Sequence, residues 1–286
     1  MITFLRFARA HTVVGTSLSL LALYLMAARS VGEHDWLLLG WSLLSCLAAN
    51  VYITGLNQLT DIDIDRINKP YLPLASGAYS VQTGRLIVLV SLALALVTAL
   101  LYWPWLTLTV YLSLALGTAY SLPPIRLKRF HFWAAFCIIA VRGLIVNILL
   151  YLHFRTALGG GAQVQTTLVL LTIIIFIFGL VIAWFKDLPD TEGDAAHGIR
   201  TLSLIKNRTW VFRWGTRLLF ATLVGVTGYC FWLGKTGLGL AHLPMIALFL
   251  FYARGADLEN QSSIARFYQG TWRVFFGVYI IYALLG

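Results

Sequence analysis

Long apolar runs separated by short polar breaks make up most of this chain of 286 residues. A helix needs about 20 apolar residues to cross the hydrocarbon core of a bilayer. Nine runs of roughly this length are predicted to span a membrane, at residues 11–28, 36–56, 82–101, 103–120, 131–152, 166–185, 209–232, 240–253 and 268–285. The pattern therefore predicts an all-α integral membrane bundle, formed as a single domain over residues 1–286.

The composition supports a membrane protein and excludes an ordinary soluble domain. Hydrophobic residues make up 59% of the chain and charged residues 11%, and the mean hydropathy is +0.82. Soluble domains carry about 25% charged residues. The first apolar run follows Arg6 and Arg9 and resembles a signal peptide in outline. Many similar runs follow it, however, so a membrane span is the favoured interpretation.

The net charge of +10 indicates membrane sidedness and not a nucleic-acid partner. If the nine spans alternate in direction, seventeen of the 21 lysines and arginines fall on one side and three on the other. Cytoplasmic loops of membrane proteins carry such an excess of basic residues. The basic side is therefore predicted to face the cytoplasm or its equivalent. No protein partner can be inferred.

The first of two acidic clusters follows the second apolar run, in the stretch NQLTDIDIDRINKP at residues 57–70. A helix that continues through this stretch would place Asn57, Asp61 and Asp65 at i, i+4 and i+8, on one face. Asp63 would then point elsewhere and is expected to be a solvated residue.

The second acidic cluster follows the sixth run, where Asp187, Asp190 and Asp194 stand at i, i+3 and i+7, although Pro189 could disturb a helix there. A single acidic helix end can simply be solvated, but two at matching inner ends favour a common role. Carboxylates on one stripe repel each other unless cations neutralise them. All-oxygen ligands suit Mg²⁺, which commonly bridges carboxylates to phosphate oxygens. The predicted metal ligands are Asp61, Asp65, Asp187, Asp190 and Asp194.

Basic side chains near both clusters fit a ligand that contains phosphate. Arginine can donate two parallel hydrogen bonds to a phosphate, and lysine acts as a point charge. Each of these residues could also be an ordinary member of the basic side. Together with the acidic clusters they indicate a diphosphate held through Mg²⁺, and the predicted binding residues are Lys69, Arg126, Lys128 and Lys186.

At this point the chain resembles the UbiA superfamily of intramembrane prenyltransferases, from about residue 10 to the C-terminus. Its members have nine helices, an NxxxDxxxD motif after the second helix, a DxxDxxxD motif after the sixth and a basic loop with tyrosine after the fourth. The matching residues are Asn57, Asp61 and Asp65, then Asp187, Asp190 and Asp194, and Tyr120, Ser121, Arg126 and Lys128 in the loop.

The resemblance implies a bundle around a central cavity, in which the two motifs bind a polyprenyl diphosphate through Mg²⁺ and the prenyl tail lies among apolar side chains. Ionisation of the diphosphate would leave an allylic cation, which an electron-rich aromatic ring attacks. Asn57 would help to fix the metal or the phosphate, and Tyr120 would stabilise the cation or the diphosphate. The expected catalytic residues are Asp61, Asp65, Asp187, Asp190 and Tyr120.

Within the superfamily the motifs look most like those of the homogentisate prenyltransferases of tocopherol and plastoquinone biosynthesis, of the phytyltransferase type. Enzymes that prenylate 4-hydroxybenzoate usually have an arginine where this chain has Leu72, and chlorophyll synthases tend to have NEP at residues 68–70. The expected reaction is transfer of a phytyl or geranylgeranyl group to homogentisate. The resemblance implies a site on the cytoplasmic or stromal side of a bacterial plasma or thylakoid membrane or of a plastid membrane. The alternatives are a 4-hydroxybenzoate or chlorophyllide type of acceptor and, in another class, a cation-coupled transporter. Transport sites usually lie near the bilayer midplane, whereas both clusters lie at one membrane face.

Arg142 differs from the other basic residues because it lies inside the fifth apolar run, where a charge is costly and is usually functional. It is predicted to bind the carboxylate of the acceptor or an oxygen of the diphosphate. The alternative is an arginine paired with backbone carbonyls of a neighbouring helix. In an α-helix, Asn147 would lie about 140° away around the axis, so the two residues need not share a face.

Overall fold

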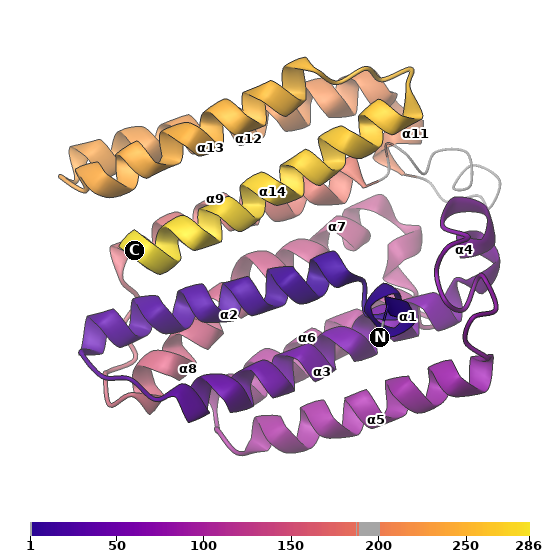
Figure 1. Cartoon of the computed structure of the whole chain (residues 1–286), viewed down its shortest axis with the longest axis horizontal. Helices are drawn as coiled ribbons and strands as arrows, with labels where there is room; N and C mark the ends of the chain where they lie inside the picture. The colour runs from indigo at the N-terminus through magenta and orange to yellow at the C-terminus, as the bar shows by residue number, and fades with distance from the viewer. Residues whose placement is uncertain (1, 187, 189–200) are drawn as a thin grey trace. The chain divides into compact units, whose positions relative to one another are not determined.

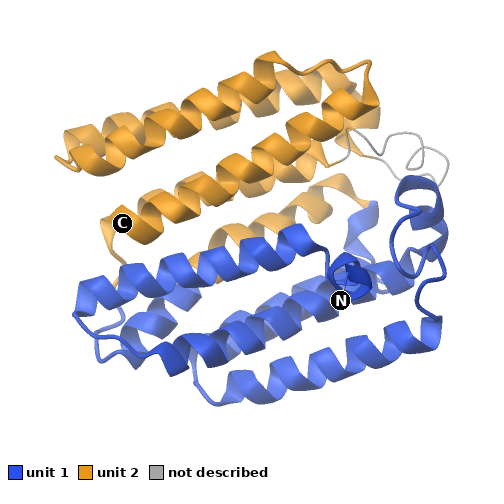
Figure 2. Ribbon diagram, in the orientation of Figure 1, with its two compact units in different colours: residues 1–129, 149–162 blue, residues 130–148, 163–286 orange. Residues whose placement is uncertain are grey.

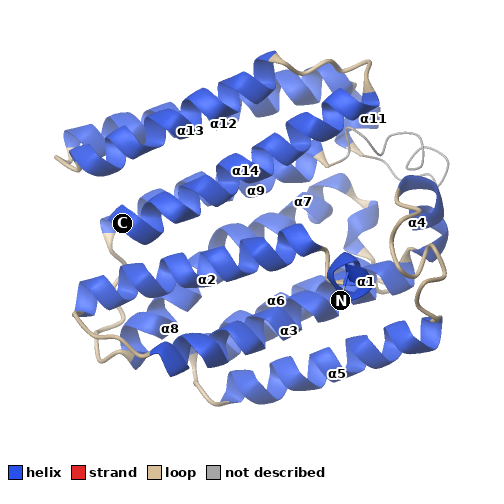
Figure 3. Cartoon of the chain, viewed as in Figure 1, coloured by secondary structure: helices blue, strands red, loops and turns tan. Residues whose placement is uncertain are grey.

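The computed structural model describes residues 2–186, 188 and 201–286, and this part of the chain consists of helices and loops without a β-strand (Figure 3). The chain divides into two compact units, residues 1–129 with 149–162 and residues 130–148 with 163–286 (Figure 2). The predicted all-α fold is confirmed.

The first unit contains six α-helices that precede residue 129, a short 3₁₀ turn and one later helix (Figure 1). They are α1 (Ile2–Phe7), α2 (Ala10–Val31), α3 (Trp36–Thr60), α4 (Ile62–Asn68), α5 (Val81–Leu100), α6 (Trp105–Ser121), η1 (Leu127–Arg129) and α8 (Leu150–Ala157). The second unit contains α7 (His131–Ile139), the π-helix η2 (Ala140–Leu149), α9 (Thr166–Phe185), α11 (Leu202–Lys206), α12 (Arg208–Trp232), α13 (Thr236–Arg254) and α14 (Gln261–Leu285).

Six helical segments are long and apolar enough to cross a bilayer. They are Ala10–Val31, Trp36–Thr60, Val81–Leu100, His131–Ala157, Thr166–Phe185 and Thr236–Arg254. The other three predicted spans also lie on helices, namely α6 with 17 residues, α12 with three arginines and α14 with two. Every predicted span therefore overlaps a helix of the described chain, and the number nine is approximate.

Polar side chains and close backbone approach hold the first unit together, as is usual between helices in a membrane. Ser42 of α3 and His153 of α8 are both buried and form a hydrogen bond of 2.9 Å. The Ser45 hydroxyl of α3 donates to the backbone oxygen of Ala95 in α5 at 3.2 Å. Helix α3 thus contacts both α5 and α8 through buried polar groups.

Gly55 of α3 lies where the aromatic ring of Phe7 and the side chain of Val88 approach the backbone most closely. A Cβ atom at residue 55 would lie 2.7 Å from atoms of both side chains. We expect Gly55→Ala to lower the melting temperature of the purified protein in detergent, because overpacking a core costs about 1–3 kcal/mol. Gly40→Ala on the same helix is the matched control, since no atom lies within 4 Å of its added Cβ. Equal melting temperatures for the two variants would contradict this view of the packing.

Aromatic side chains fill the core of the second unit. The ring of Phe267 on α14 lies 4.8 Å from that of Phe185 on α9 and 4.9 Å from that of Phe212 on α12. Phe178 of α9 packs on Phe275 of α14 at 5.7 Å. Helix α14 therefore packs on α9 and α12 through these ring pairs, in geometries that stabilise aromatic pairs.

Candidate active site

The candidate site is built around a break in the backbone at Asp61. Helix α3 ends at Thr60, Asp61 takes φ −124° and ψ 19°, and α4 begins at the next residue. The expectation of one continuous helix through Asn57, Asp61 and Asp65 is therefore wrong, and like charges one turn apart disfavour such a helix. The two side chains remain in contact despite the break, because Asn57 Nδ2 donates to Asp61 Oδ2 at 2.9 Å.

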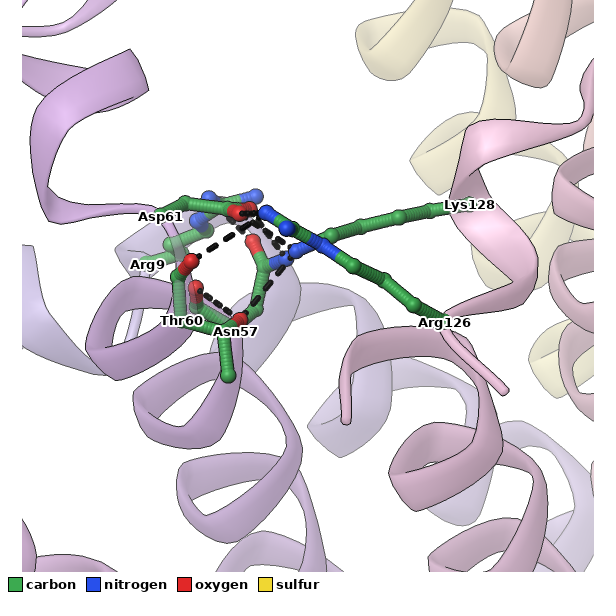
Figure 4. A network of polar contacts seen from close by, with 6 residues as sticks. All are labelled: Arg9, Asn57, Thr60, Asp61, Arg126 and Lys128. Carbon is green, nitrogen blue, oxygen red and sulfur yellow. Dashed lines mark hydrogen bonds and ion pairs between the residues drawn. The ribbon is translucent and has the colours of Figure 1, made fainter. Parts of the chain in front are cut away.

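Two cations from the loop after α6 bind the Asp61 carboxylate, as Figure 4 shows. Lys128 Nζ lies 2.5 Å from Asp61 Oδ1 and 3.1 Å from Thr60 Oγ1. Arg126 Nη2 lies 3.0 Å from the same carboxylate oxygen and 3.3 Å from the Thr60 backbone oxygen. Arg126 and Lys128 thus contact the first acidic motif, although they lie 60 to 70 positions away in the sequence. Both were predicted to be binding residues.

Arg9 is a member of this network that the sequence did not reveal. Its Nη2 donates to Asn57 Oδ1 at 2.9 Å (Figure 4). The backbone around it is held by α3, because Gln58 Nε2 donates to the Phe7 backbone oxygen at 2.6 Å and Asn50 Nδ2 donates to that of Ala8 at 3.3 Å. In the sequence Arg9 resembles any other basic residue near the first span, so no local signal distinguished it.

Both arginines of the network adopt backbone conformations that L-residues rarely take. Arg9 has φ 54° and Arg126 has φ 38°. Such strain is retained only where the surrounding contacts hold it, and it gathers at binding and active sites. The two guanidinium groups are therefore placed by their backbones, and the strain supports a functional role for the network.

Burial dominates the electrostatics of Asp65, which is 5% exposed. It raises the pKa of this carboxyl to about 6, and the charge of Asp61 adds to the effect, whereas Arg9, Lys69 and Lys128 oppose it. Burial also lowers the pKa of Lys128, against the opposing effect of Asp61. Three cations, at Arg9, Arg126 and Lys128, thus lie around Asn57 and Asp61, and this excess of positive charge over the carboxylates of Asp61 and Asp65 suits a further anion.

The oxygens of this network fit a divalent metal. Asp65 Oδ2 is buried and has no hydrogen-bond partner in the described part of the chain. Carboxylate oxygens are preferred ligands of Mg²⁺. Within residues 2–186, 188 and 201–286, no three acidic, histidine or cysteine side chains gather closely enough to hold a metal. The predicted ligands Asp187, Asp190 and Asp194 lie outside the described residues.

The other predicted residues lie at helix ends. Lys69 follows α4 and is half-buried, and it interacts electrostatically with Asp65. Tyr120 is half-buried in the last turn of α6, one turn before the loop that carries Arg126. Lys186 is half-buried at the end of α9, in the second unit. Asp63 is exposed and pairs with Arg66 at 2.8 Å, as expected for a solvated residue.

Arg142 lies in the second unit near the middle of the apolar segment His131–Ala157, where a charge costs about 2.5–3.5 kcal/mol on insertion scales. Its guanidinium carbon lies 5.0 Å from the centroid of the Trp272 ring and 5.6 Å from that of Phe275. The Arg142 guanidinium therefore rests on aromatic rings of α14. The α-helical geometry assumed for Asn147 is wrong, because η2 is a π-helix and Asn147 Nδ2 donates to the Arg142 backbone oxygen at 3.3 Å.

The described chain is thus a helical membrane protein with an amide, two carboxylates and three cations at the end of a span, a site of the class that binds an anionic headgroup. The sequence matches the UbiA prenyltransferase family over residues 18–278. It is 44% identical to homogentisate phytyltransferase of Synechocystis, over 98% of this chain and 94% of that protein. It is 40% identical to homogentisate phytyltransferase 1 of Arabidopsis thaliana, over 99% of this chain and 75% of that protein.

The fold agrees with this relationship. A UbiA homologue from Archaeoglobus fulgidus bound to GPP and Mg²⁺ superimposes with a TM-score of 0.66 at 16% identity, over 98% of this chain and 99% of that one. The chain belongs to the UbiA prenyltransferase family. It is therefore an enzyme of prenyl transfer within a membrane.

Proposed function

We propose that the chain transfers a phytyl group from phytyl diphosphate to homogentisate, with Mg²⁺, as in tocopherol biosynthesis. The observation that carries the proposal is the network at Asp61, in which Lys128 and Arg126 converge on one carboxylate oxygen of the first motif. Homogentisate as acceptor and phytyl as the transferred group are supported by the two phytyltransferases to which the chain is 44% and 40% identical.

The cations of the network are assigned to the diphosphate. In the reaction the bond between the allylic carbon and oxygen breaks, and its electron pair leaves with the diphosphate. Arg126 and Lys128 stabilise the charge that develops on the leaving oxygens, because donors fixed in advance at such a position act most strongly in a site that excludes water. Arg9 orients Asn57, which in turn orients Asp61.

The carboxylates are assigned to the metal. Asp61 and Asp65 of the first motif would hold Mg²⁺, together with Asp187, Asp190 and Asp194 of the second motif. Bound Mg²⁺ supplies Lewis-acid stabilisation of the diphosphate oxygens. Lys69 and Lys186 balance the remaining negative charge, and Tyr120 faces the allylic cation or the diphosphate.

The new bond joins the allylic carbon to a carbon of the aromatic ring. The ring then loses a proton, the acetate side chain loses CO₂, and the side-chain carbon takes up a proton to become a methyl group. The excess of basic residues on one side of the spans supports a site that opens to the cytoplasm or the stroma.

The proposal is tested by prenyl transfer with the purified chain in detergent and Mg²⁺. Homogentisate and 4-hydroxybenzoate are offered separately, each with phytyl, geranylgeranyl or solanesyl diphosphate. We expect prenylated product with homogentisate, most rapidly with phytyl diphosphate, and none after EDTA treatment until Mg²⁺ is restored. Product with 4-hydroxybenzoate alone would keep the reaction class and replace the acceptor. Full activity in EDTA would refute the metal assignment.

A further inference from the structure

Arg142 is held by aromatic rings and has no acidic partner among the residues that the structure describes. Its guanidinium lies over Trp272 and Phe275, at 5.0 and 5.6 Å from the ring centroids. The described acidic residues of the second unit, Asp257 and Glu259, lie in the loop between α13 and α14 and form no ion pair with it.

The backbone that carries Arg142 is an unusual π-helix tied by side-chain hydrogen bonds. Asn147 is fully buried, donates Nδ2 to the backbone oxygens of Arg142 and Gly143 at 3.3 and 3.1 Å, and accepts a hydrogen bond of 2.8 Å from the Tyr279 hydroxyl. Gly143 lies so close to Phe176 that a Cβ atom would be 2.9 Å from its Cα. π-helical turns of this kind occur frequently at functional sites.

A guanidinium stacked on rings keeps its N–H groups free at the edge. Those groups form a planar fork that matches a carboxylate with two parallel hydrogen bonds. The Arg142 side chain is only half-buried, in contrast to the buried Trp272 and Phe275 beneath it. The arrangement therefore presents a positive, bidentate donor among aromatic side chains inside an apolar segment.

The charge decides which ligand this donor suits. One guanidinium neutralises one carboxylate, and the resulting pair carries no net charge into apolar surroundings. A diphosphate carries about three negative charges near neutral pH, and a single arginine would leave most of them uncompensated, which apolar surroundings strongly disfavour. The first unit already gathers three cations at Asp61 for that ligand.

We propose that Arg142 binds the carboxylate of the aromatic acceptor and thereby selects acidic acceptors over neutral ones, an inference that rests on the proposed function. The acceptor ring lies against the aromatic side chains around Arg142. Ion pairing stabilises the charged carboxylate, so Arg142 binds and orients the acceptor and takes no part in the loss of CO₂.

The test compares homogentisate with its neutral amide, 2,5-dihydroxyphenylacetamide, as acceptors for the purified native protein, Arg142→Gln and Arg142→Lys. A hydrogen-bonded pair with a charged group accounts for about a 10- to 100-fold difference in binding. We expect Arg142→Gln to raise KM for homogentisate by about this factor. KM for the amide and KM for the prenyl diphosphate should stay unchanged. Arg142→Lys keeps the charge and most of the volume and should give an intermediate KM for homogentisate.

Arg217→Gln is the matched control. Arg217 also stacks on a tryptophan of the second unit, Trp214 at 5.5 Å, but both residues are exposed. Its loss should leave every KM as in the native protein. An equal rise in KM for homogentisate and for its amide in Arg142→Gln would overturn the inference. A selective rise in KM for the prenyl diphosphate would overturn it as well.

The same experiment separates this inference from the proposed function. If the native protein prenylates 4-hydroxybenzoate but not homogentisate, the proposed acceptor is wrong. The inference about Arg142 then stands if Arg142→Gln raises KM for 4-hydroxybenzoate and leaves KM for its neutral amide unchanged. It falls if both KM values rise.

Discussion

Replacing Asp61 by asparagine is expected to lower kcat/KM for prenyl transfer by a factor on the order of 10³. The carboxylate accepts from Lys128 at 2.5 Å, from Arg126 at 3.0 Å and from Asn57 at 2.9 Å. Asparagine keeps the size of the side chain but removes its charge, so the two cations lose their shared partner and the proposed Mg²⁺ site loses one of its ligands. Initial rates with homogentisate and phytyl diphosphate, together with Mg²⁺ titration of the variant, measure both effects.

Asp63→Asn provides the control within the same motif. Its side chain is 83% exposed and pairs with the exposed side chain of Arg66 at 2.8 Å. Removing this charge should leave kcat/KM within about twofold, since exposed ion pairs contribute little. A loss as large as that of Asp61→Asn would mean that overall charge, and not the geometry at Asp61, governs activity.

The second large effect is expected for Lys128→Met, with a fall in kcat/KM of about 10²-fold. The ammonium group lies between Asp61 and Thr60 and is mostly buried, so no other side chain can easily replace it. Methionine preserves the apolar part of the side chain. Because the cation is assigned to the leaving diphosphate, kcat should fall and KM for the prenyl diphosphate should rise, whereas KM for the acceptor should not change.

Arg129→Met tests whether the effect belongs to the loop as a whole. Arg129 closes the same 3₁₀ turn but is exposed. Activity near the native value is the expected result for this variant. If Arg129→Met and Lys128→Met were equally impaired, the loop would act through its total charge, and the specific contact with Asp61 would lose its assigned role.

The sequence predicted the parts of the site that follow from local pattern. Asn57 and Asp61 are four residues apart, and their side chains form a hydrogen bond although the helix breaks between Thr60 and Ile62. The exposed position of Asp63 was also predictable, because it lies off the shared stripe. The break itself was not predictable, because helix propensity depends on the local sequence, whereas the cations that bind Asp61 come from outside the helix.

Contacts between distant segments escaped prediction. Arg9 is one of many basic residues in the sequence, and only the packing of the α1–α2 connection on α3 brings it to Asn57, 48 positions away. Arg142 was marked by its place in an apolar run, but its partners Trp272 and Phe275 lie about 130 residues further on. The π-helix that links Arg142 to Asn147 has no recognisable sequence signal.

The sequence by itself determined the membrane location, the helical class and the positions of the spans, because a bilayer responds to the length of an apolar run, which is a local property of the chain. It also determined the first acidic motif and its family. Only the tertiary structure decided that Arg126 and Lys128 share one oxygen of Asp61 and that Arg142 rests on the rings of α14. Ion pairs and ring contacts act over a few ångströms, so their partners are decided by which helices pack together.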